Sequence, residues 1–266
     1  MSCVLGIDIG SAHSKCVLLS EGKVIERIDR PSGGDFAVTA DELRRDLLAR
    51  TGISPEAIER TIATGYGAKS VGFASDTRSD ITCHSMGVHL LLPSARTVID
   101  VGDLYSKVFK VDGRGHANNF LLSGKCAGGS GRVLQVIAKV LHVPVEDIGE
   151  MSLRSKNRVD FNTGCVVFAE SEAVSRIAEG VPKEDLLAGI HRALAAQIYN
   201  LAERLGIETE LALVGGGARD VGLVKALEEI SGGKVLVPEE PHMTAALGAA
   251  IIAETETMEP TEPIPH

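Results

Sequence analysis

A pattern of strand, tight turn and returning strand occurs twice in this sequence, and it restricts the fold more than any other feature. Residues 4–10 and 97–102 are apolar runs in which an aspartate precedes a glycine by two positions. A second apolar run follows each glycine, which predicts a hairpin of two strands. The matching residues keep a constant offset of 92: Asp8, Gly10, Ser14 and Lys15 in the first copy, and Asp100, Gly102, Ser106 and Lys107 in the second. Self-similarity of this kind predicts a duplicated α/β architecture.

The aspartate and the glycine of each hairpin suit phosphate chemistry. A carboxylate at a strand end can hold a hydrated metal ion, while N–H groups of the turn face a phosphate. Two such hairpins facing each other across a cleft would hold a phosphate chain and its Mg²⁺ from both sides. A further glycine cluster, residues 215–217, follows the apolar run 211–214. It can let the backbone approach a flat ligand, or it can serve tight packing alone.

The length and composition of the chain bound its organisation. With 266 residues, it can form one large domain or two of about 100–150 residues. Pro93 marks the boundary between an N-terminal half, residues 1–93, and a C-terminal half, residues 94–253. Residues 254–266 are rich in Glu, Thr and Pro, which predicts a disordered tail. Apolar spacing predicts helices over residues 40–48, 184–205 and 244–250.

Charge and hydropathy exclude several functional classes. A formal net charge of −9 disfavours a general binder of nucleic acid or of anionic membranes. No apolar run is long enough to span a bilayer, and no signal-peptide pattern opens the chain, so we expect a cytoplasmic protein. Five cysteines at irregular spacing, in a reducing compartment, do not predict a disulfide framework.

Two cysteines are distinguished by a glycine-containing turn that precedes an amphipathic pattern. Cys126 lies in the small-residue loop 124–132, and the apolar spacing that follows predicts a helix beginning near Ser130. Cys165 follows Gly164 and leads into a second segment of this kind. Because a helix N-terminus favours a thiolate, both thiols are candidates for reactive or metal-binding use.

The other three cysteines fit structural roles. Cys3 and Cys16 fall on apolar runs that predict buried strands, where a thiol behaves as a small core residue. Cys83 and His84 are adjacent in the sequence and therefore do not share a face of a helix or strand. We interpret this pair as local packing or hydrogen bonding rather than as a metal site.

The motifs, taken in chain order, resemble those of the acetate-kinase, sugar-kinase, Hsp70 and actin superfamily. They are Gly-Ile-Asp-Ile-Gly-Ser at 6–11, Ile-Asp-Val-Gly at 99–102, Gly-Gly-Gly-Ala-Arg at 215–219 and Ala-Ala-Leu-Gly at 245–248. Within it, residues 65–67, 81–84, 125–132 and 165–172 resemble the BadF/BadG/BcrA/BcrD group, over about residues 3 to 253. This group contains 2-hydroxyacyl-CoA dehydratase activators and ATPase subunits of benzoyl-CoA reductase. The resemblance implies a duplicated actin-like (ribonuclease H-like) ATPase fold with a nucleotide cleft between two halves.

The resemblance also implies roles for particular residues. Asp8 and Asp100 would be the catalytic residues that organise Mg²⁺ and the attacking water. Residues implied to bind ATP or otherwise to hold a cofactor are Gly10, Ser11, Ala12, Lys15, Gly102, Gly215, Gly216, Gly217 and Glu170. Cys126 and Cys165 would ligate a [4Fe–4S] cluster. Since such a cluster normally takes four thiolates and one chain offers two, a two-fold dimer would supply the set.

The implied activity is ATP-dependent electron transfer. ATP hydrolysis would move the helices that hold the cluster and deliver a low-potential electron to an iron–sulfur partner that acts on an acyl-CoA. Reduced ferredoxin or flavodoxin would be the electron donor, and the active form would be a homodimer or a heterodimer with a paralogous ATPase subunit.

One stretch departs from the family pattern. Dehydratase activators usually carry Gly-Gly-Gln-Asp after the second Asp-x, whereas residues 102–105 here are Gly-Asp-Leu-Tyr. In this altered stretch the chain resembles the non-identical partner subunit of benzoyl-CoA reductase. This resemblance favours pairing with a paralogue and a lower rate of ATP hydrolysis for this chain alone. Two alternatives stay open. One is a small-molecule kinase of amino-sugar type without a cluster, and the other is a nucleotide-dependent regulatory protein without turnover.

Overall fold

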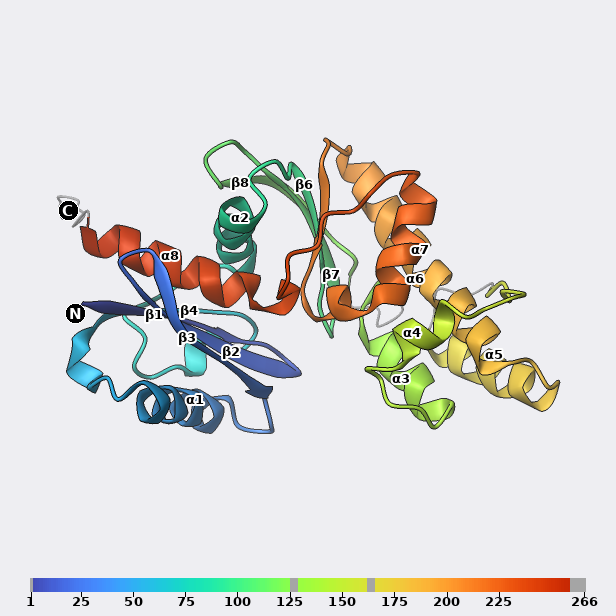
Figure 1. Ribbon diagram of the computed structural model, residues 1–266, viewed down its shortest axis with the longest axis horizontal. Helices are drawn as coiled ribbons and strands as arrows, with labels where there is room; N and C mark the ends of the chain where they lie inside the picture. The colour runs from blue at the N-terminus through green and yellow to red at the C-terminus, as the bar shows by residue number, and fades with distance from the viewer. Residues whose placement is uncertain (1, 125–128, 162–165, 259–266) are drawn as a thin grey trace. The chain divides into compact units, whose positions relative to one another are not determined.

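The structure is a computed structural model that describes residues 2–124, 129–161 and 166–258 (Figure 1). The chain divides into two compact units. Unit 1 contains Met1–Pro93, Gly113–Ala117 and Met243–His266, and unit 2 contains Ser94–Asp112 and Asn118–His242. Each unit carries its own β-sheet. The Asp-x-Gly hairpins predicted from the sequence lie one in each sheet.

Unit 1 is built on a five-stranded sheet with the strand order β3-β2-β1-β4-β5. The strands are β1 (Cys3–Ile9), β2 (His13–Ser20), β3 (Lys23–Pro31), β4 (Ile58–Thr64) and β5 (Asp76–Thr77). The helices are α1 (Phe36–Thr51), α2 (Asp80–Leu91) and α8 (Thr244–Met258), with short 3₁₀ turns η1 (Pro55–Ala57) and η2 (Ala68–Ser70). The 3₁₀ turn η5 (Pro241–Met243) spans the boundary in the sequence at which unit 2 ends and the last segment of unit 1 begins. β1 pairs with β2 antiparallel and with β4 parallel.

Helices cover both faces of this sheet, and its central strand β1 is buried over its whole length. Alternate residues of β1 point to opposite faces. Leu5, Ile7 and Ile9 pack in one cluster with Leu43 of α1. Val4 and further residues of β2 and β4 pack in a second cluster with α8. In Figure 1, α1 accordingly lies on one side of the sheet, and α2 with α8 on the other.

Helix α1 is longer than the sequence pattern predicts. The apolar spacing predicts a helix over 40–48, whereas the helix spans Phe36–Thr51. Its start is fixed by Asp35, whose side chain accepts hydrogen bonds from the N–H groups of Ala37 and Val38. Its end is fixed by Gly52, which adopts the left-handed conformation that a C-terminal cap requires. The caps, rather than the apolar stripe, therefore set its length.

Helix α8 is also longer than the sequence indicates. Residues 254–258, which composition places in a disordered tail, form its last turn. Glu256 Oε2 forms an ion pair with Arg60 Nη2 at 2.6 Å, and Glu256 Oε1 accepts a hydrogen bond from Arg78 Nη2 at 2.6 Å. These ion pairs tie the helix end to distant parts of unit 1. In addition, α8 is part of unit 1, although the sequence places it in the C-terminal half.

Small residues allow α8 to lie against both β1 and α2. A Cβ added at Gly6 of β1, at Gly87 of α2 or at Gly248 of α8 would come closer than 3.0 Å to backbone atoms of the neighbouring element. The glycines therefore set the spacing between these elements. This packing explains the small-residue composition of the predicted helix 244–250.

Gly248→Ala is expected to destabilise unit 1 by about 1–3 kcal/mol, because the new methyl group would overlap the carbonyl oxygen of Cys83. For a chain of this size, each kcal/mol lowers Tm by roughly 2–4 °C. Calorimetry on both proteins measures the shift. Gly72→Ala is the matched control, because a Cβ at Gly72 meets nothing within 4 Å. Equal melting temperatures for the two variants would contradict the packing argument.

Unit 2 is built on a four-stranded sheet with the order β8-β7-β6-β9. The strands are β6 (Thr97–Val101), β7 (Ser106–Val111), β8 (Ala117–Leu122) and β9 (Leu211–Val214). The helices are α3 (Arg132–Val140), α4 (Ile148–Ser152), α5 (Val166–Ala178), α6 (Lys183–Leu205) and α7 (Val221–Ser231), with the 3₁₀ turn η4 (Gly216–Arg219). β6 pairs with β7 antiparallel and with β9 parallel, as β1 pairs with β2 and β4.

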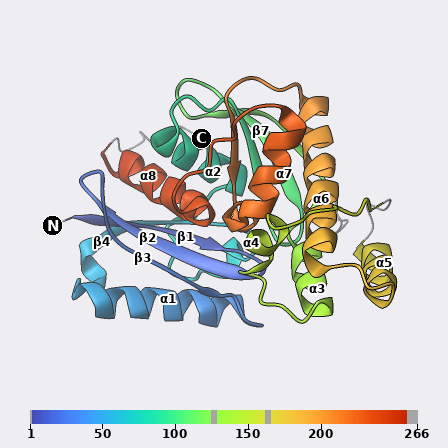
Figure 2. The same cartoon turned by 45° about the vertical axis from the view of Figure 1, so that its right-hand side comes forward.

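The core of unit 2 forms between its sheet and its helices. The predicted helix 184–205 is α6, and its apolar stripe is buried, which confirms the interpretation of that stripe as core. The buried members of the stripe are Leu187, Ile190, Leu194, Ile198 and Leu201. In Figure 2, α6 and α7 lie side by side. Of the described residues, none belongs to a helix long and apolar enough to cross a membrane.

Candidate functional site

The first half-site lies at the carboxyl end of β1 in unit 1. Asp8 is directly opposite Lys15 of β2 in the antiparallel register. Lys15 Nζ donates to Asp8 Oδ2 at 3.0 Å, and Asp8 is only 6% exposed. A buried carboxylate is costly unless it is paired, so Lys15 accounts for the position of this charge.

The turn after Asp8 is held by Ser32 at the start of the segment that follows β3. Ser32 Oγ donates to the carbonyl oxygen of Gly10 at 2.6 Å, and Ser32 N–H donates to that of Ala12 at 2.9 Å. The predicted phosphate residues Gly10, Ser11 and Ala12 therefore lie on one fixed turn beside Asp8. A fixed turn can present its N–H groups to an anion without an ordering cost at binding.

The second half-site repeats this geometry in unit 2. Asp100 of β6 is opposite Lys107 of β7, and Lys107 Nζ donates to Asp100 Oδ2 at 2.7 Å. Asp100 is 3% exposed. The ring of Tyr105 lies 5.4 Å from Lys107 Nζ, a cation–π distance. The offset of 92 residues in the sequence is thus also a structural repeat of carboxylate, lysine and turn.

A glycine turn approaches each carboxylate, and this part of the repeat is not evident from the predicted hairpins. Gly65 follows β4 with φ +87°, and Gly215 follows β9 with φ +83°. A Cβ at Gly65 would come closer than 3.0 Å to Asp8 Oδ1, and one at Gly215 would come equally close to Asp100 Oδ1. Only glycine fits at these two positions. Gly65 is therefore a site residue that the sequence analysis missed.

The signal that could have revealed Gly65 is a short one. Residues 65–68 read Gly-Tyr-Gly-Ala, and residues 215–218 read Gly-Gly-Gly-Ala. Each stretch follows the strand that pairs parallel to the aspartate strand, with Asp8 opposite Thr64 and Asp100 opposite Val214. Both continue into a 3₁₀ turn, η2 or η4. Gly65 to Gly67 is thus the structural counterpart of Gly215 to Gly217.

These residues fit a magnesium nucleotide in both units. Each half-site has a hard carboxylate oxygen that suits Mg²⁺, an ammonium group that suits phosphate, and glycine backbone that a ligand can approach. A Cβ at Gly216 would meet nothing within 4 Å, so the surface of this turn is open. This donor set suits a site that handles phosphate.

Comparison with known proteins agrees with this chemistry. The model of the BadF/BadG/BcrA/BcrD ATPase family matches residues 5–253. The chain belongs to this family. It is 38% identical to the 2-hydroxyisocaproyl-CoA dehydratase activator of Clostridioides difficile, over 96% of each chain. It is 38% identical to the (R)-2-hydroxyglutaryl-CoA dehydratase activating ATPase of Acidaminococcus fermentans, over 94% of this chain and 96% of the relative.

A solved structure supports the fold assignment. The activator of the 2-hydroxyisocaproyl-CoA dehydratase from Clostridium difficile with bound ADPNP superimposes with a TM-score of 0.92 at 36% identity. The match covers 99% of this chain and 100% of that one. The expectation of a duplicated actin-like ATPase fold is thereby confirmed, as is the resemblance to the BadF/BadG/BcrA/BcrD family.

The candidate cluster ligands of this ATPase, Cys126 and Cys165, lie outside the described residues. The helices that follow them are described: α3 begins at Arg132 and α5 at Val166. Glu170 lies on α5 and is exposed. Within residues 2–124, 129–161 and 166–258, no group of three or more His, Cys, Asp or Glu side chains could hold a metal ion.

The three described cysteines confirm the prediction of structural roles. Cys3, Cys16 and Cys83 are buried and form no disulfide. His84 Nδ1 lies 2.7 Å from Thr244 Oγ1, so this side chain is hydrogen-bonded between α2 and α8. Burial in apolar surroundings raises the pKa of the Cys16 thiol and that of the Cys83 thiol to about 12.

Cys16 and Cys83 of this ATPase are expected to resist alkylation in the folded protein. The thiolate is the reactive form, and with a pKa of about 12 only about 10⁻⁴ of each thiol is ionised at pH 8. Iodoacetamide labelling followed by peptide mass spectrometry measures this. We expect no labelling of either residue at pH 8, a rate that rises about tenfold per pH unit while the fold persists, and full labelling in denaturant. Rapid labelling of the folded protein at pH 8 would contradict the burial.

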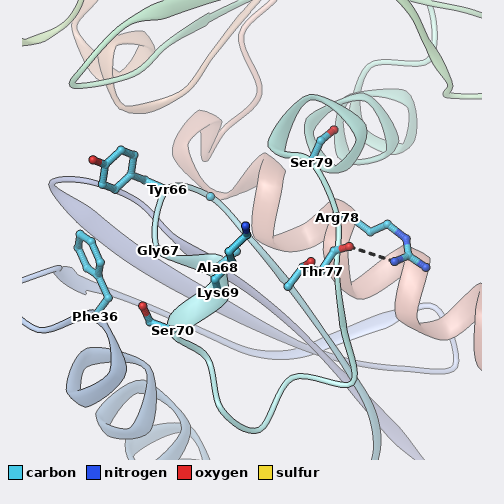
Figure 3. A pocket seen from close by; sticks show the side chains of 10 residues that line it. Phe36, Tyr66, Gly67, Ala68, Lys69, Ser70, Thr77, Arg78 and Ser79 are labelled. Carbon is cyan, nitrogen blue, oxygen red and sulfur yellow. Dashed lines mark hydrogen bonds between the residues drawn. The ribbon is translucent and has the colours of Figure 1, made fainter.

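A pocket of about 350 Å³ lies beside the Gly65 turn in unit 1 (Figure 3). The rings of Phe36 and Tyr66 meet edge to face at one side of it, with centroids 5.9 Å apart. Arg78 also lines the pocket, but its guanidinium donates to the carbonyl oxygen of Thr77 at 3.0 Å and pairs with Glu256. The pocket therefore shares the Gly65 to Gly67 turn with the first half-site.

Proposed function

We propose that this chain is an ATP-hydrolysing electron-transfer component that activates an iron–sulfur enzyme acting on a 2-hydroxyacyl-CoA. The observation that carries the proposal is the repeated half-site, in which a buried aspartate, a lysine and a glycine turn recur in both units. Two relatives at 38% identity are named as an activator and an activating ATPase of such dehydratases. A nucleotide site together with this similarity supports ATP-driven activation more strongly than the fold alone would.

In this proposal, Asp8 and Asp100 organise Mg²⁺ and orient the water that attacks the γ-phosphate. Lys15 and Lys107 hold the carboxylates in place and offset part of the negative charge that nucleotide brings. The turns at residues 10–12 and 215–217 present N–H groups to phosphate and adenosine. Phosphoryl transfer requires mainly positioning and charge stabilisation, which these residues can supply without covalent chemistry.

The redox part of the proposal assigns Cys126 and Cys165 as cluster ligands. Both precede a helix, since α3 begins at Arg132 and α5 at Val166, and helix N-termini stabilise negative charge. A [4Fe–4S] cluster, when bound, supplies one-electron transfer at low potential. Two chains would provide its four thiolates, either two copies of this chain or this chain and a paralogue. Reduced ferredoxin or flavodoxin would be the electron donor.

The proposal predicts that anaerobically purified protein contains about four iron and four sulfide per two chains. Cys126→Ser and Cys165→Ser are each expected to lower iron to less than about a tenth of that value, because two of the four thiolates are lost from a homodimer and one from a heterodimer. Iron and sulfide analysis with a UV–visible spectrum measures the result. Cys3→Ala is the control, since this buried thiol lies in the core of unit 1.

Two results would contradict the proposal in different ways. Full iron content in both serine variants would remove the assigned ligands. Iron-free protein that phosphorylates an amino sugar would favour the kinase alternative. ATP hydrolysis measured with and without an acyl-CoA dehydratase, and separately with a benzoyl-CoA reductase, tests the partner. Turnover that depends on neither enzyme would contradict the activator role.

A further inference from the structure

The loop at residues 102–105 departs from the usual family sequence, and in this structure it is bonded to the start of α3. Within unit 2, the Asp103 carboxylate accepts from Arg132 Nη2 on one oxygen and from Gln135 Nε2 at 3.1 Å on the other. Both donors lie on the first turn of α3. The Asp103 side chain is 8% exposed and that of Arg132 is 44% exposed, so solvent screens this ion pair in part and the hydrogen bonds fix the geometry together with it.

The backbone of the same loop is bonded to the same helix start. Ser130 Oγ donates to the carbonyl oxygen of Asp103 at 2.8 Å, and Gly131 N–H donates to that of Gly102 at 2.8 Å. The loop and the N-terminus of α3 are therefore joined by main-chain and side-chain bonds together. Moving one without the other would break several hydrogen bonds and a charge-assisted pair.

The loop at residues 102–105 connects the second half-site with the start of α3. At one end, the loop begins two residues after Asp100, and its Tyr105 ring lies 5.4 Å from Lys107 Nζ. At the other end, α3 begins six residues after Cys126 in the sequence. One loop thus contacts the second half-site directly and also fixes the helix that follows a candidate cluster ligand.

We infer that Asp103 is a positioning residue that couples the nucleotide state of the second half-site to the position of α3. The inference rests on the proposed function and extends it, because it names the residues of this chain through which ATP acts on the redox segment. A ligand shifts a structural element only through contacts that differ between two states. The hydrogen bonds from residues 102–103 to α3 supply such contacts. A movement of the phosphate turn on nucleotide exchange would move α3 through them.

The inference is tested with hydrogen–deuterium exchange of peptides covering α3, recorded with ADP and with ADPNP. The variants are Asp103→Asn, Arg132→Gln and the double variant, and Arg158→Gln is the control because it removes an exposed ion pair with Glu229 elsewhere in unit 2. In the wild type and the control, we expect uptake by α3 to differ between the two nucleotides. In the three variants, we expect that difference to fall at least about threefold while ADPNP affinity changes less than about threefold.

The double variant distinguishes a coupled pair from two independent losses. If Asp103 and Arg132 act together, the double variant loses no more than either single variant. Additive losses would overturn the assignment, as would a full nucleotide-dependent difference in Asp103→Asn. A tenfold loss of ADPNP affinity would also overturn it, since Asp103 would then serve binding itself. Wild-type protein that does not bind ADPNP would instead refute the nucleotide site, and with it both the proposed function and this inference.

Discussion

Asp100→Asn is expected to lower the rate of ATP hydrolysis by about 10²–10⁴-fold, the usual effect of removing a group that orients or deprotonates the attacking water. The amide has nearly the same shape as the carboxylate but lacks the charge that Mg²⁺ and the water require. Asp8→Asn is expected to act in the same way, because Asp8 and Lys15 repeat the geometry of Asp100 and Lys107. A phosphate-release assay at saturating ATP measures both.

A control must show that the loss is chemical rather than structural. Asp185 is also a buried carboxylate of unit 2, and its Oδ1 accepts from Ser155 Oγ at 2.7 Å and from the N–H groups of Lys156 and Asn157 at 2.9 Å. The Asn157 N–H bond, followed by the Ser155 bond, holds the pKa of Asp185 below its usual value. Asp185→Asn should therefore lower stability at neutral pH without lowering the hydrolysis rate of the folded protein. Wild-type rates for Asp8→Asn and Asp100→Asn would refute both catalytic assignments.

The sequence was sufficient to predict the duplicated hairpins because their signal is local. Strand alternation, the Asp-x-Gly turn and the returning lysine all fall within 12 residues, so the offset of 92 could be read directly. The turns at Gly65 and Gly215 belong to the same repeat but are 150 residues apart. The offset differs because the connections from the hairpin to the parallel strand differ in length: α1 and η1 in unit 1, and α3 to α6 in unit 2.

Long-range charges account for what composition could not predict. The Glu and Thr content of residues 254–258 favours disorder, but Glu256 pairs with Arg60 and Arg78, which lie about 180–200 residues earlier in the sequence. Similarly, the sequence shows that Asp103 departs from the family pattern, but only the structure shows its bonds to Arg132 and Gln135. In both cases the interacting side chain is distant in the sequence, so no local sequence pattern predicts the contact.

Gly65→Ala and Gly215→Ala are each expected to lower the hydrolysis rate by about 10²-fold or more, because a displacement of about 1 Å at a reacting group can cost that much. The new methyl group would overlap Asp8 Oδ1 or Asp100 Oδ1 and push the carboxylate away from its lysine. A side chain at positive φ also costs about 1–2 kcal/mol of stability. Hydrolysis rate and melting temperature are measured on the same preparations.

Backbone strain and collision can be separated with two further glycines. Gly52 and Gly232 also have positive φ, at +67° and +70°, but a Cβ there would meet nothing within 4 Å. Gly52→Ala and Gly232→Ala, at the ends of α1 and α7, should therefore lose stability without loss of hydrolysis rate. If all four variants hydrolyse ATP equally well, the glycine turns do not hold the carboxylates in place. If only Gly65→Ala and Gly215→Ala are impaired, ATP hydrolysis requires the close approach of each glycine turn to its aspartate, and it requires it in both units.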